Sequence, residues 1–133
     1  GKRPFLIPFF CMFLPFLLIF IGGGLGSLCR YIVSACWLKG TDASFPWPTL
    51  AVNLSGCLLI GLFIGLLSRR QSEGPYWLLV TGFCGGFTTF STFSNETFQL
   101  LRQGMWLTAL SYALLSVIGG IGCTACGYTL CKS

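Results

Sequence analysis

Long apolar stretches, separated by short polar links, are the feature that most limits how this chain can fold. Of its 133 residues, 54% are hydrophobic and 8% are charged, whereas a soluble domain carries roughly 25% charged residues. An apolar stretch of about 20 residues is long enough to cross the hydrocarbon core of a bilayer as a helix. The composition therefore predicts an all-α membrane protein with one compact domain and no separate soluble domain.

Four apolar stretches predict four transmembrane helices. The first begins between Pro15 and Leu18 and ends near Trp37. The others cover approximately residues 48–68, 75–101 and 105–131. Because the links between these stretches are short, helices adjacent in sequence are expected to run antiparallel. Residues 16–133 are therefore predicted to form a four-helix transmembrane bundle.

The first 15 residues are expected to differ from the bundle. Lys2 and Arg3 precede an apolar run that contains three prolines, and proline interrupts a helix. The run also lacks the small-residue cleavage site of a signal peptide. We therefore expect residues 1–15 to form a kinked lead-in at the membrane interface.

The lysine and arginine residues give only a weak indication of orientation, although the cytoplasmic side of a membrane protein is usually richer in them. If both termini lie on one side, that side holds Lys2, Arg3, Arg69, Arg70 and Lys132, and the other holds Arg30, Lys39 and Arg102. This distribution favours cytoplasmic termini slightly. It is also compatible with insertion in both orientations.

Several functional classes are disfavoured by the residue types that the chain lacks. It has no histidine, no paired carboxylates and no base beside its serines, so an enzyme is not expected. The glycine run at residues 22–26 has neither a preceding strand nor a following Lys-Ser/Thr, so nucleotide binding is not expected. A nucleic-acid partner is not expected either. No second cysteine pair at zinc-type spacing accompanies Cys123 and Cys126, so the eight cysteines are interpreted as packing residues.

One polar segment, residues 82–96, lies inside the third apolar stretch. It reads Gly-Phe-Cys-Gly-Gly-Phe-Thr-Thr-Phe-Ser-Thr-Phe-Ser-Asn-Glu. Gly85 and Gly86 can leave the helical conformation, and a break there would free backbone carbonyls at membrane depth. Freed carbonyls are suitable ligands for a small cation such as Na⁺. The alternative, which is more common for a glycine pair taken alone, is a close contact between two helices.

Hydroxyl groups and aromatic rings alternate in the second half of this segment. Within seven positions it carries Thr88, Thr89, Ser91, Thr92 and Ser94, interleaved with phenylalanines. Single hydroxyls in a membrane helix usually bond back to the preceding turn, and phenylalanines spaced by three usually pack. Here the hydroxyl donors lie beside ring edges, which carry positive potential. Donors without carboxylates suit a desolvated anion better than a cation.

Other polar residues within the apolar stretches are candidates for the same pathway. Asn53 makes either an interhelical hydrogen bond or donates into a pore. Tyr112 and Ser116 are four residues apart and share a helix face, which Gly120 and Thr124 continue. Arg30 either extends to the membrane interface, which is the more usual outcome, or collects anions at a vestibule.

Taken together, these residues resemble the Fluc/CrcB family of fluoride channels. Three blocks carry the resemblance, in order: Gly23-x-x-Gly26-x-x-x-Arg30-Tyr31, Thr49-x-x-Val52-Asn53-x-x-Gly56, and the segment 82–96 without its Asn95. The third block is the most specific, and the resemblance extends over residues 22–130. It implies a cell-membrane channel that moves fluoride passively out of the cytoplasm and so reduces fluoride toxicity.

The resemblance also implies an assembly and a set of site residues. The family pattern is a four-helix subunit with a broken third helix, paired as an antiparallel, dual-topology homodimer around a structural Na⁺, although a sister subunit could replace the second copy. The backbone carbonyls of Gly85 and Thr88 would bind the Na⁺. The fluoride pathway would be lined by Asn53, Phe90, Ser91, Thr92, Phe93, Tyr112 and Ser116, with Arg30, Thr49 and Glu96 nearby. Gly120 departs from the hydroxyl that the family often carries at that position.

Two other functions are compatible with a small four-helix membrane protein. A small multidrug exporter would need a carboxylate in the bundle interior for proton coupling, and Glu96 is the only acidic residue within a predicted span. A non-transporting assembly subunit would use the polar segment only to join helices. Fluoride efflux from liposomes that contain the purified protein distinguishes these alternatives.

Overall fold

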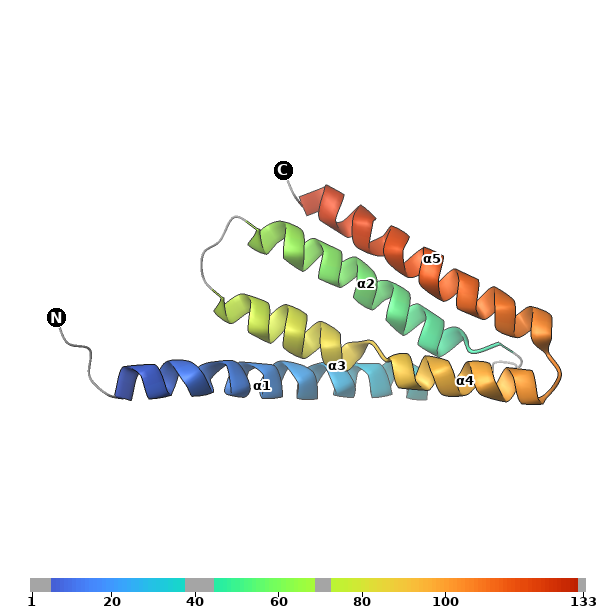
Figure 1. Ribbon diagram of the computed structural model, residues 1–133, viewed down its shortest axis with the longest axis horizontal. Helices are drawn as coiled ribbons and strands as arrows, with labels where there is room; N and C mark the ends of the chain where they lie inside the picture. The colour runs from blue at the N-terminus through green and yellow to red at the C-terminus, as the bar shows by residue number, and fades with distance from the viewer. Residues whose placement is uncertain (1–5, 38–44, 69–72, 132–133) are drawn as a thin grey trace.

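The structure is a helical bundle in which one segment is interrupted partway along its length by a short non-helical link, between α3 and α4 (Figure 1). The computed structural model describes residues 6–37, 45–68 and 73–131, with the backbone alone for residues 6–10. The elements in these ranges are α1 (Leu6–Trp37), α2 (Trp47–Leu67), the π-helix η1 (Tyr76–Cys84), α3 (Gly85–Phe87), α4 (Phe90–Arg102) and α5 (Trp106–Cys131). The all-α prediction is confirmed for these residues.

Three of the helices in the described ranges are long and apolar enough to cross a membrane. They are α1 over Cys11–Trp37, α2 and α5. Many large apolar side chains on these helices point outward, including Phe20 and Leu107, which are each 80% exposed. Outward apolar surface is stable in lipid, so these faces suit contact with acyl chains.

The first helix begins earlier than the sequence predicts. Helix α1 starts at Leu6 and continues through Pro15 without interruption, whereas the expected start lay between Pro15 and Leu18. A proline removes one backbone donor but does not always end a helix in a membrane, because neighbouring groups can satisfy the freed carbonyl. The assignment of residues 1–15 to the interface remains a prediction, and residues 1–5 lie outside the described ranges.

The third apolar segment is broken, but at threonines and not at the glycine pair. Gly85 has helical dihedral angles (φ −62°, ψ −38°), and Gly86 lies within α3. The backbone becomes extended at Thr88 (φ −84°, ψ 155°) and Thr89 (φ −147°, ψ 118°). The predicted break at Gly85-Gly86 is therefore wrong in position, and the helix resumes at Phe90 as α4.

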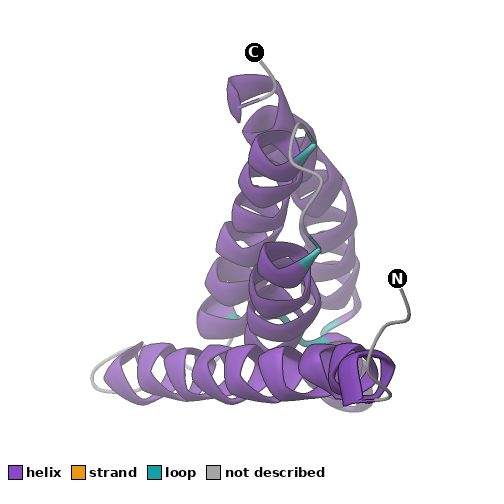
Figure 2. Cartoon of the chain, turned by 90° about the vertical axis from the view of Figure 1, so that its left-hand side faces the viewer, coloured by secondary structure: helices purple, strands orange, loops and turns teal. Residues whose placement is uncertain are grey.

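Two pairs of helices hold the bundle together through glycine contacts. Helices α2 and α5 run side by side (Figure 1), and a side chain at Gly61 would collide with the Thr124 carbonyl oxygen. Figure 2 shows α1 crossing the other helices at a steep angle. At that crossing, a side chain at Gly26 would meet the Phe83 carbonyl and one at Gly86 would meet the Gly23 carbonyl. The close-contact interpretation of the glycine pair is thus correct for Gly86.

A small apolar core fixes α4 against α2 and α5. It consists of Leu50, Leu100, Ala109 and Tyr112, with partly buried side chains around it. Leu100 lies near the C-terminal end of α4. The core therefore anchors this end of α4 against α2 and α5.

We predict that Gly26→Ala destabilises the protein and that Gly24→Ala does not. At Gly26 the added methyl group would overlap the Phe83 backbone, whereas at Gly24 nothing lies within 4 Å. Overpacking of this kind typically costs about 1–3 kcal/mol. The measurement is the thermal unfolding midpoint of each variant in detergent. Equal midpoints for the two variants would contradict the close α1–η1 contact.

Candidate functional site

The break at Thr88 and Thr89 interrupts the helical hydrogen bonds in a defined way. The last regular bond runs from the Thr88 N–H to the Cys84 carbonyl (3.0 Å). The Thr89 N–H bonds instead to the Asn53 side chain, and the Thr92 N–H bonds to the Thr89 hydroxyl. In a continuous helix these two N–H groups would bond to the carbonyls of Gly85 and Thr88. Those two carbonyls are therefore freed from regular helical pairing.

Asn53, in the N-terminal third of α2, binds the extended backbone at the break. Its Oδ1 accepts from the Thr89 N–H (2.9 Å), and its Nδ2 donates to the Thr89 carbonyl (3.2 Å). A primary amide has two N–H donors, so one donor remains after these bonds. The two alternatives for Asn53 are thus compatible, because it bonds across helices and also lines the cavity described below.

The hydroxyl groups at the break organise the start of α4. The Thr89 Oγ1 accepts from the Thr92 N–H (3.2 Å), donates to the Thr92 Oγ1 (3.1 Å), and lies 3.4 Å from the Ser91 Oγ. A side-chain acceptor of this kind is the usual cap of a helix N-terminus. The N-terminus of a helix carries partial positive charge. This end of α4 therefore favours an anion.

Arg30 reaches the break from α1. Its Nε donates to the Gly86 carbonyl (3.2 Å), which the Ser27 hydroxyl also approaches (3.5 Å). The Arg30 side chain therefore contacts α3. Extension to the membrane interface alone would not produce this contact. A small cavity of about 20 Å³ lies beside it, lined by Arg30, Ser34, Thr49, Val52, Thr89 and Thr92. Thr49 is accordingly close to Arg30, on the N-terminal turn of α2.

A cavity of about 270 Å³ opens on the other side of the break. It is lined by Asn53, Gly56, Cys57, Ile60, Cys84, Thr88, Thr89, Phe90, Phe93, Ser116 and Val117. Asn53, Phe90, Phe93 and Ser116, which the sequence predicts for the pathway, thus meet in one space although they come from three helices. No charged side chain is among these lining residues. The Ser116 Oγ is buried and has no hydrogen-bond partner within the described part of the chain.

Phe90 and Phe93 form one wall of this cavity. Their ring centroids are 5.8 Å apart and the planes are tilted by 48°. Phe90 is 79% exposed in the single chain, although it lies beside the polar break. The Phe90 ring therefore lines the cavity while most of its surface lies outside the packing of this chain.

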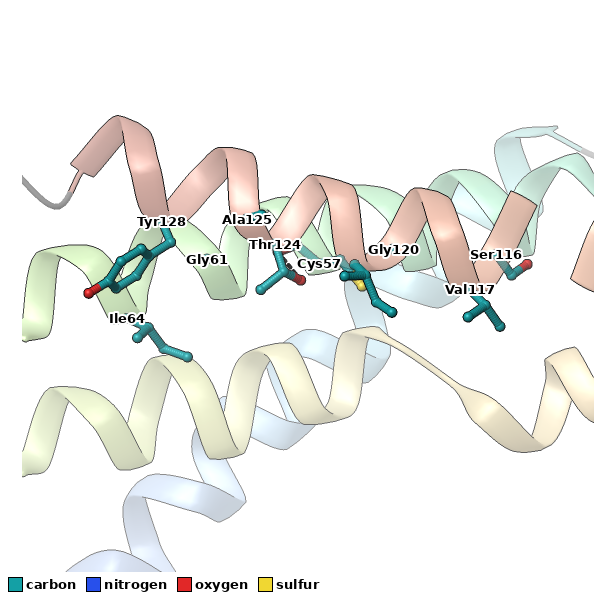
Figure 3. A pocket seen from close by; sticks show the side chains of 10 residues that line it. Cys57, Gly61, Ile64, Ser116, Val117, Gly120, Thr124, Ala125 and Tyr128 are labelled. Atoms are coloured by element: carbon teal, nitrogen blue, oxygen red, sulfur yellow. Dashed lines mark hydrogen bonds between the residues drawn. The ribbon is translucent and has the colours of Figure 1, made fainter. Parts of the chain in front are cut away.

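The cavity continues into a larger groove between α2 and α5. This groove has a volume of about 570 Å³ and is lined in part by Ser116, Gly120, Thr124 and Tyr128 (Figure 3). Cys57, Ser116 and Val117 line both spaces. The Thr124 hydroxyl donates to the Cys57 carbonyl (3.2 Å). The expected face of α5 is therefore observed from Ser116 to Thr124, with Gly120 leaving the middle of the face without a hydroxyl.

Tyr112 lies apart from this groove, although it shares the helix face. Its side chain is 0% exposed, and its hydroxyl donates to the Glu96 Oε1 (3.0 Å). Its ring packs against Phe93 (5.0 Å between centroids) and Phe45 (5.6 Å). The Tyr112–Glu96 pair was not predicted from the sequence. The signal for it was available, because Glu96 is the only acidic residue in a predicted span and needs a buried donor.

Comparison with known proteins identifies the family. Residues 17–128 match the family described as CrcB-like protein, Camphor Resistance (CrcB). The chain belongs to the CrcB family. The matched residues include the break, both cavities and Arg30, and α1 extends beyond them at its N-terminal end.

Relatives in the CrcB family carry a functional name. A protein of Flavobacterium psychrophilum named fluoride-specific ion channel FluC is 46% identical over 116 residues, which cover 86% of this chain and 94% of that protein. A protein of the same name from Phocaeicola vulgatus is 49% identical over 106 residues, covering 79% and 88%. A third, from Leptospira interrogans, is 46% identical over 119 residues, covering 88% and 94%. Family membership and the three apolar helices make this chain a multi-pass membrane protein.

We predict that Tyr112→Phe lowers stability, because it removes the donor that faces the Glu96 carboxyl group. Loss of one intramolecular hydrogen bond typically costs about 0.5–1.5 kcal/mol, and the Glu96 carboxyl group is partly buried. Tyr31→Phe is the matched control, since the Tyr31 side chain is 68% exposed. The measurement is the unfolding midpoint in detergent. A midpoint for Tyr112→Phe as high as that for Tyr31→Phe would show that the Glu96 contact contributes nothing.

Proposed function

We propose that this chain is a subunit of a fluoride-specific ion channel, which lets fluoride leave the cytoplasm passively and so limits fluoride toxicity. The observation that carries the proposal is the cavity at the helix break, where Asn53, Phe90, Phe93 and Ser116 meet. The names of the CrcB relatives support the same conclusion. The residues that line this cavity lie within residues 17–128, which match the CrcB family.

The chemistry of this cavity suits a small, strongly hydrated anion. Fluoride must exchange its water for other donors, and the cavity offers the remaining Asn53 N–H and the Ser116 hydroxyl, which has no partner among the described residues. The ring edges of Phe90 and Phe93 add positive potential. The positive end of α4 also faces this region. Ser91 and Thr92, in the first turn of α4, would supply further hydroxyls along the path.

We further propose that the functional unit is an antiparallel dimer of four-span subunits. In this assembly η1, α3 and α4 together form the fourth, broken crossing. The freed carbonyls and the exposed ring of Phe90 support a partner, because a broken backbone segment cannot face lipid without a large free-energy cost. The nearly balanced lysine and arginine counts are compatible with dual topology. The second subunit is a copy of this chain, or a sister subunit where one exists.

A structural Na⁺ at the break is part of the same proposal. The carbonyls of Gly85 and Thr88 lose their regular helical partners to Asn53 and Thr89, and carbonyl oxygens are ligands for hard cations. The residues present therefore fit such an ion. When bound, it would neutralise the freed carbonyls and stabilise the extended backbone, without being transported.

The small multidrug alternative is less well supported by the same geometry. Proton-coupled export needs a carboxylate that changes its protonation state in the substrate path. Glu96 is partly buried and accepts a hydrogen bond from the Tyr112 hydroxyl, and it is not among the residues that line the 270 Å³ cavity or the groove. A carboxyl group in this position is suited to fixing α4 on α5, not to exchanging protons with a substrate site.

We predict that Asn53→Asp reduces fluoride efflux from proteoliposomes to the rate of empty liposomes. The substitution removes the donor to the Thr89 carbonyl and places negative charge where the anion passes. Ser55→Ala is the control, because the Ser55 hydroxyl bonds only within α2, to Ala51 and Val52, and its efflux should match the unchanged protein.

Two results would contradict these conclusions in different ways. Normal efflux through Asn53→Asp would remove Asn53 from the pathway while leaving the channel proposal intact. Efflux from the unchanged protein no faster than from empty liposomes would reject the channel proposal itself. Elution of every variant as a single species from gel filtration establishes that it is folded.

We predict that Na⁺ raises the unfolding midpoint of the purified protein. A ligand that binds only the folded state stabilises it by about 2.7 kcal/mol at 100 times its dissociation constant. The midpoint is measured in Na⁺, K⁺ and N-methylglucamine at equal ionic strength, and only Na⁺ is expected to raise it. The same midpoint in all three solutions would reject the cation site at Gly85 and Thr88.

A further inference from the structure

Two cysteines face the proposed conduction cavity. Cys57 on α2 and Cys84 on η1 both line the 270 Å³ space beside Asn53. All eight cysteines of the chain are free thiols, and those at positions 11, 36 and 126 are exposed on the outer surface. Cys57 and Cys84 differ from those three in position, because both line the cavity beside the polar break.

The backbone around both thiols is held in place. The Cys84 carbonyl accepts from the Thr88 N–H (3.0 Å) and from the Thr88 hydroxyl (2.8 Å). The Cys57 carbonyl accepts from the Thr124 hydroxyl (3.2 Å). Cys84 is only 2% exposed, so its side chain has little room to change its rotamer. Two cysteines whose backbone carbonyls are held by these hydrogen bonds therefore line the same cavity from neighbouring helices.

Cys57 also lies where this cavity meets the groove between α2 and α5. It lines both the 270 Å³ cavity and the groove between α2 and α5 (Figure 3). Its sulfur lies 3.3 Å from the position that a side chain at Gly120 would occupy. The glycine, at the position where the face of α5 lacks a hydroxyl, therefore leaves room for the sulfur. Ser116, the buried hydroxyl without a partner in the described ranges, lines the same junction.

We propose that Cys57 and Cys84 form a binding site for a soft, thiophilic cation of the Hg²⁺, Ag⁺ or Cu⁺ class inside the conduction cavity. Soft metals select thiolate ligands, and two thiolates satisfy the linear coordination that these ions accept. On binding, two S–H bonds break, two metal–sulfur bonds form and two protons pass to solvent, with no change of oxidation state. The ordinary role of cysteine in helix packing accounts for the burial of Cys84 but predicts no metal binding.

Occupation of this site is expected to block fluoride flow, a consequence that rests on the proposed channel function. The metal would lie at the junction beside Ser116 and would fill part of a cavity of only 270 Å³. A cation fixed there would also hold an anion that entered and so prevent its onward movement. The metal site itself does not depend on conduction, so the two conclusions can be tested separately.

The test uses Hg²⁺ in chloride-free solution on full-length protein in which the other six cysteines are alanine. We expect one Hg²⁺ per chain, seen as mercury–thiolate charge-transfer absorption, and loss of fluoride efflux over the same concentration range. Cys57→Ala and Cys84→Ala, each in this background, should weaken binding at least tenfold. Inhibition is expressed relative to the metal-free efflux of each variant, and Cys84→Ser provides a second substitution of the same shape.

The outcomes separate the metal site from the channel. Unchanged Hg²⁺ affinity after either substitution would overturn the two-thiol site, as would inhibition that persists when both thiols are absent. A protein that binds one Hg²⁺ through both thiols but never carries fluoride would retain the metal site and reject the channel. If a variant does not fold, the absorption titration of the unsubstituted pair and of Cys84→Ser still decides the stoichiometry and ligands.

Discussion

The rest of the structure depends on two hydrogen bonds between the Asn53 side chain and the backbone of Thr89. In a membrane, an unpaired backbone group costs several kcal/mol, so a helix can break there only if other groups replace the missing bonds. Asn53 satisfies both the N–H and the carbonyl of Thr89. It thereby allows the helix to end before Thr88 and α4 to begin at Phe90, and the cavity that Asn53 and Phe93 line lies beside this break.

Close backbone contacts between α1 and the third apolar segment also stabilise the break. Because Gly86 and Gly26 have no side chains, α1 approaches the third segment closely enough for its backbone to meet theirs. Only at that distance can the Nε of Arg30 reach the Gly86 carbonyl. A guanidinium at the C-terminal end of a helix is favourable because the freed carbonyls there carry partial negative charge. Arg30 therefore stabilises the end of α3 while Asn53 stabilises the extended residues that follow it.

The sequence was sufficient to predict the helical architecture and four of the residues that meet in the cavity, Asn53, Phe90, Phe93 and Ser116, because long apolar stretches and a dense polar motif are local signals. It was not sufficient to place the break. The conformational freedom of Gly85 and Gly86 suggested a break at the pair, but Gly86 serves close packing and the backbone leaves the helix at Thr88. The deciding partner, Asn53, is 36 residues away from Thr89. Likewise, local pattern could not pair Tyr112 with Glu96, 16 residues apart.

A helix break produces two kinds of site at once, and this explains why cation and anion chemistry lie so close together here. The segment before the break ends in freed carbonyls, which favour a cation, whereas the segment after it begins with N–H groups, which favour an anion. Gly86 already meets a cation, the guanidinium of Arg30, and the carbonyls of Gly85 and Thr88 are the groups proposed for Na⁺. The N-terminal turn of α4 points toward the cavity that Phe90 and Phe93 line. One interruption of regular structure thus supplies both the carbonyls that attract a stabilising cation and the polarised donors along the proposed fluoride path.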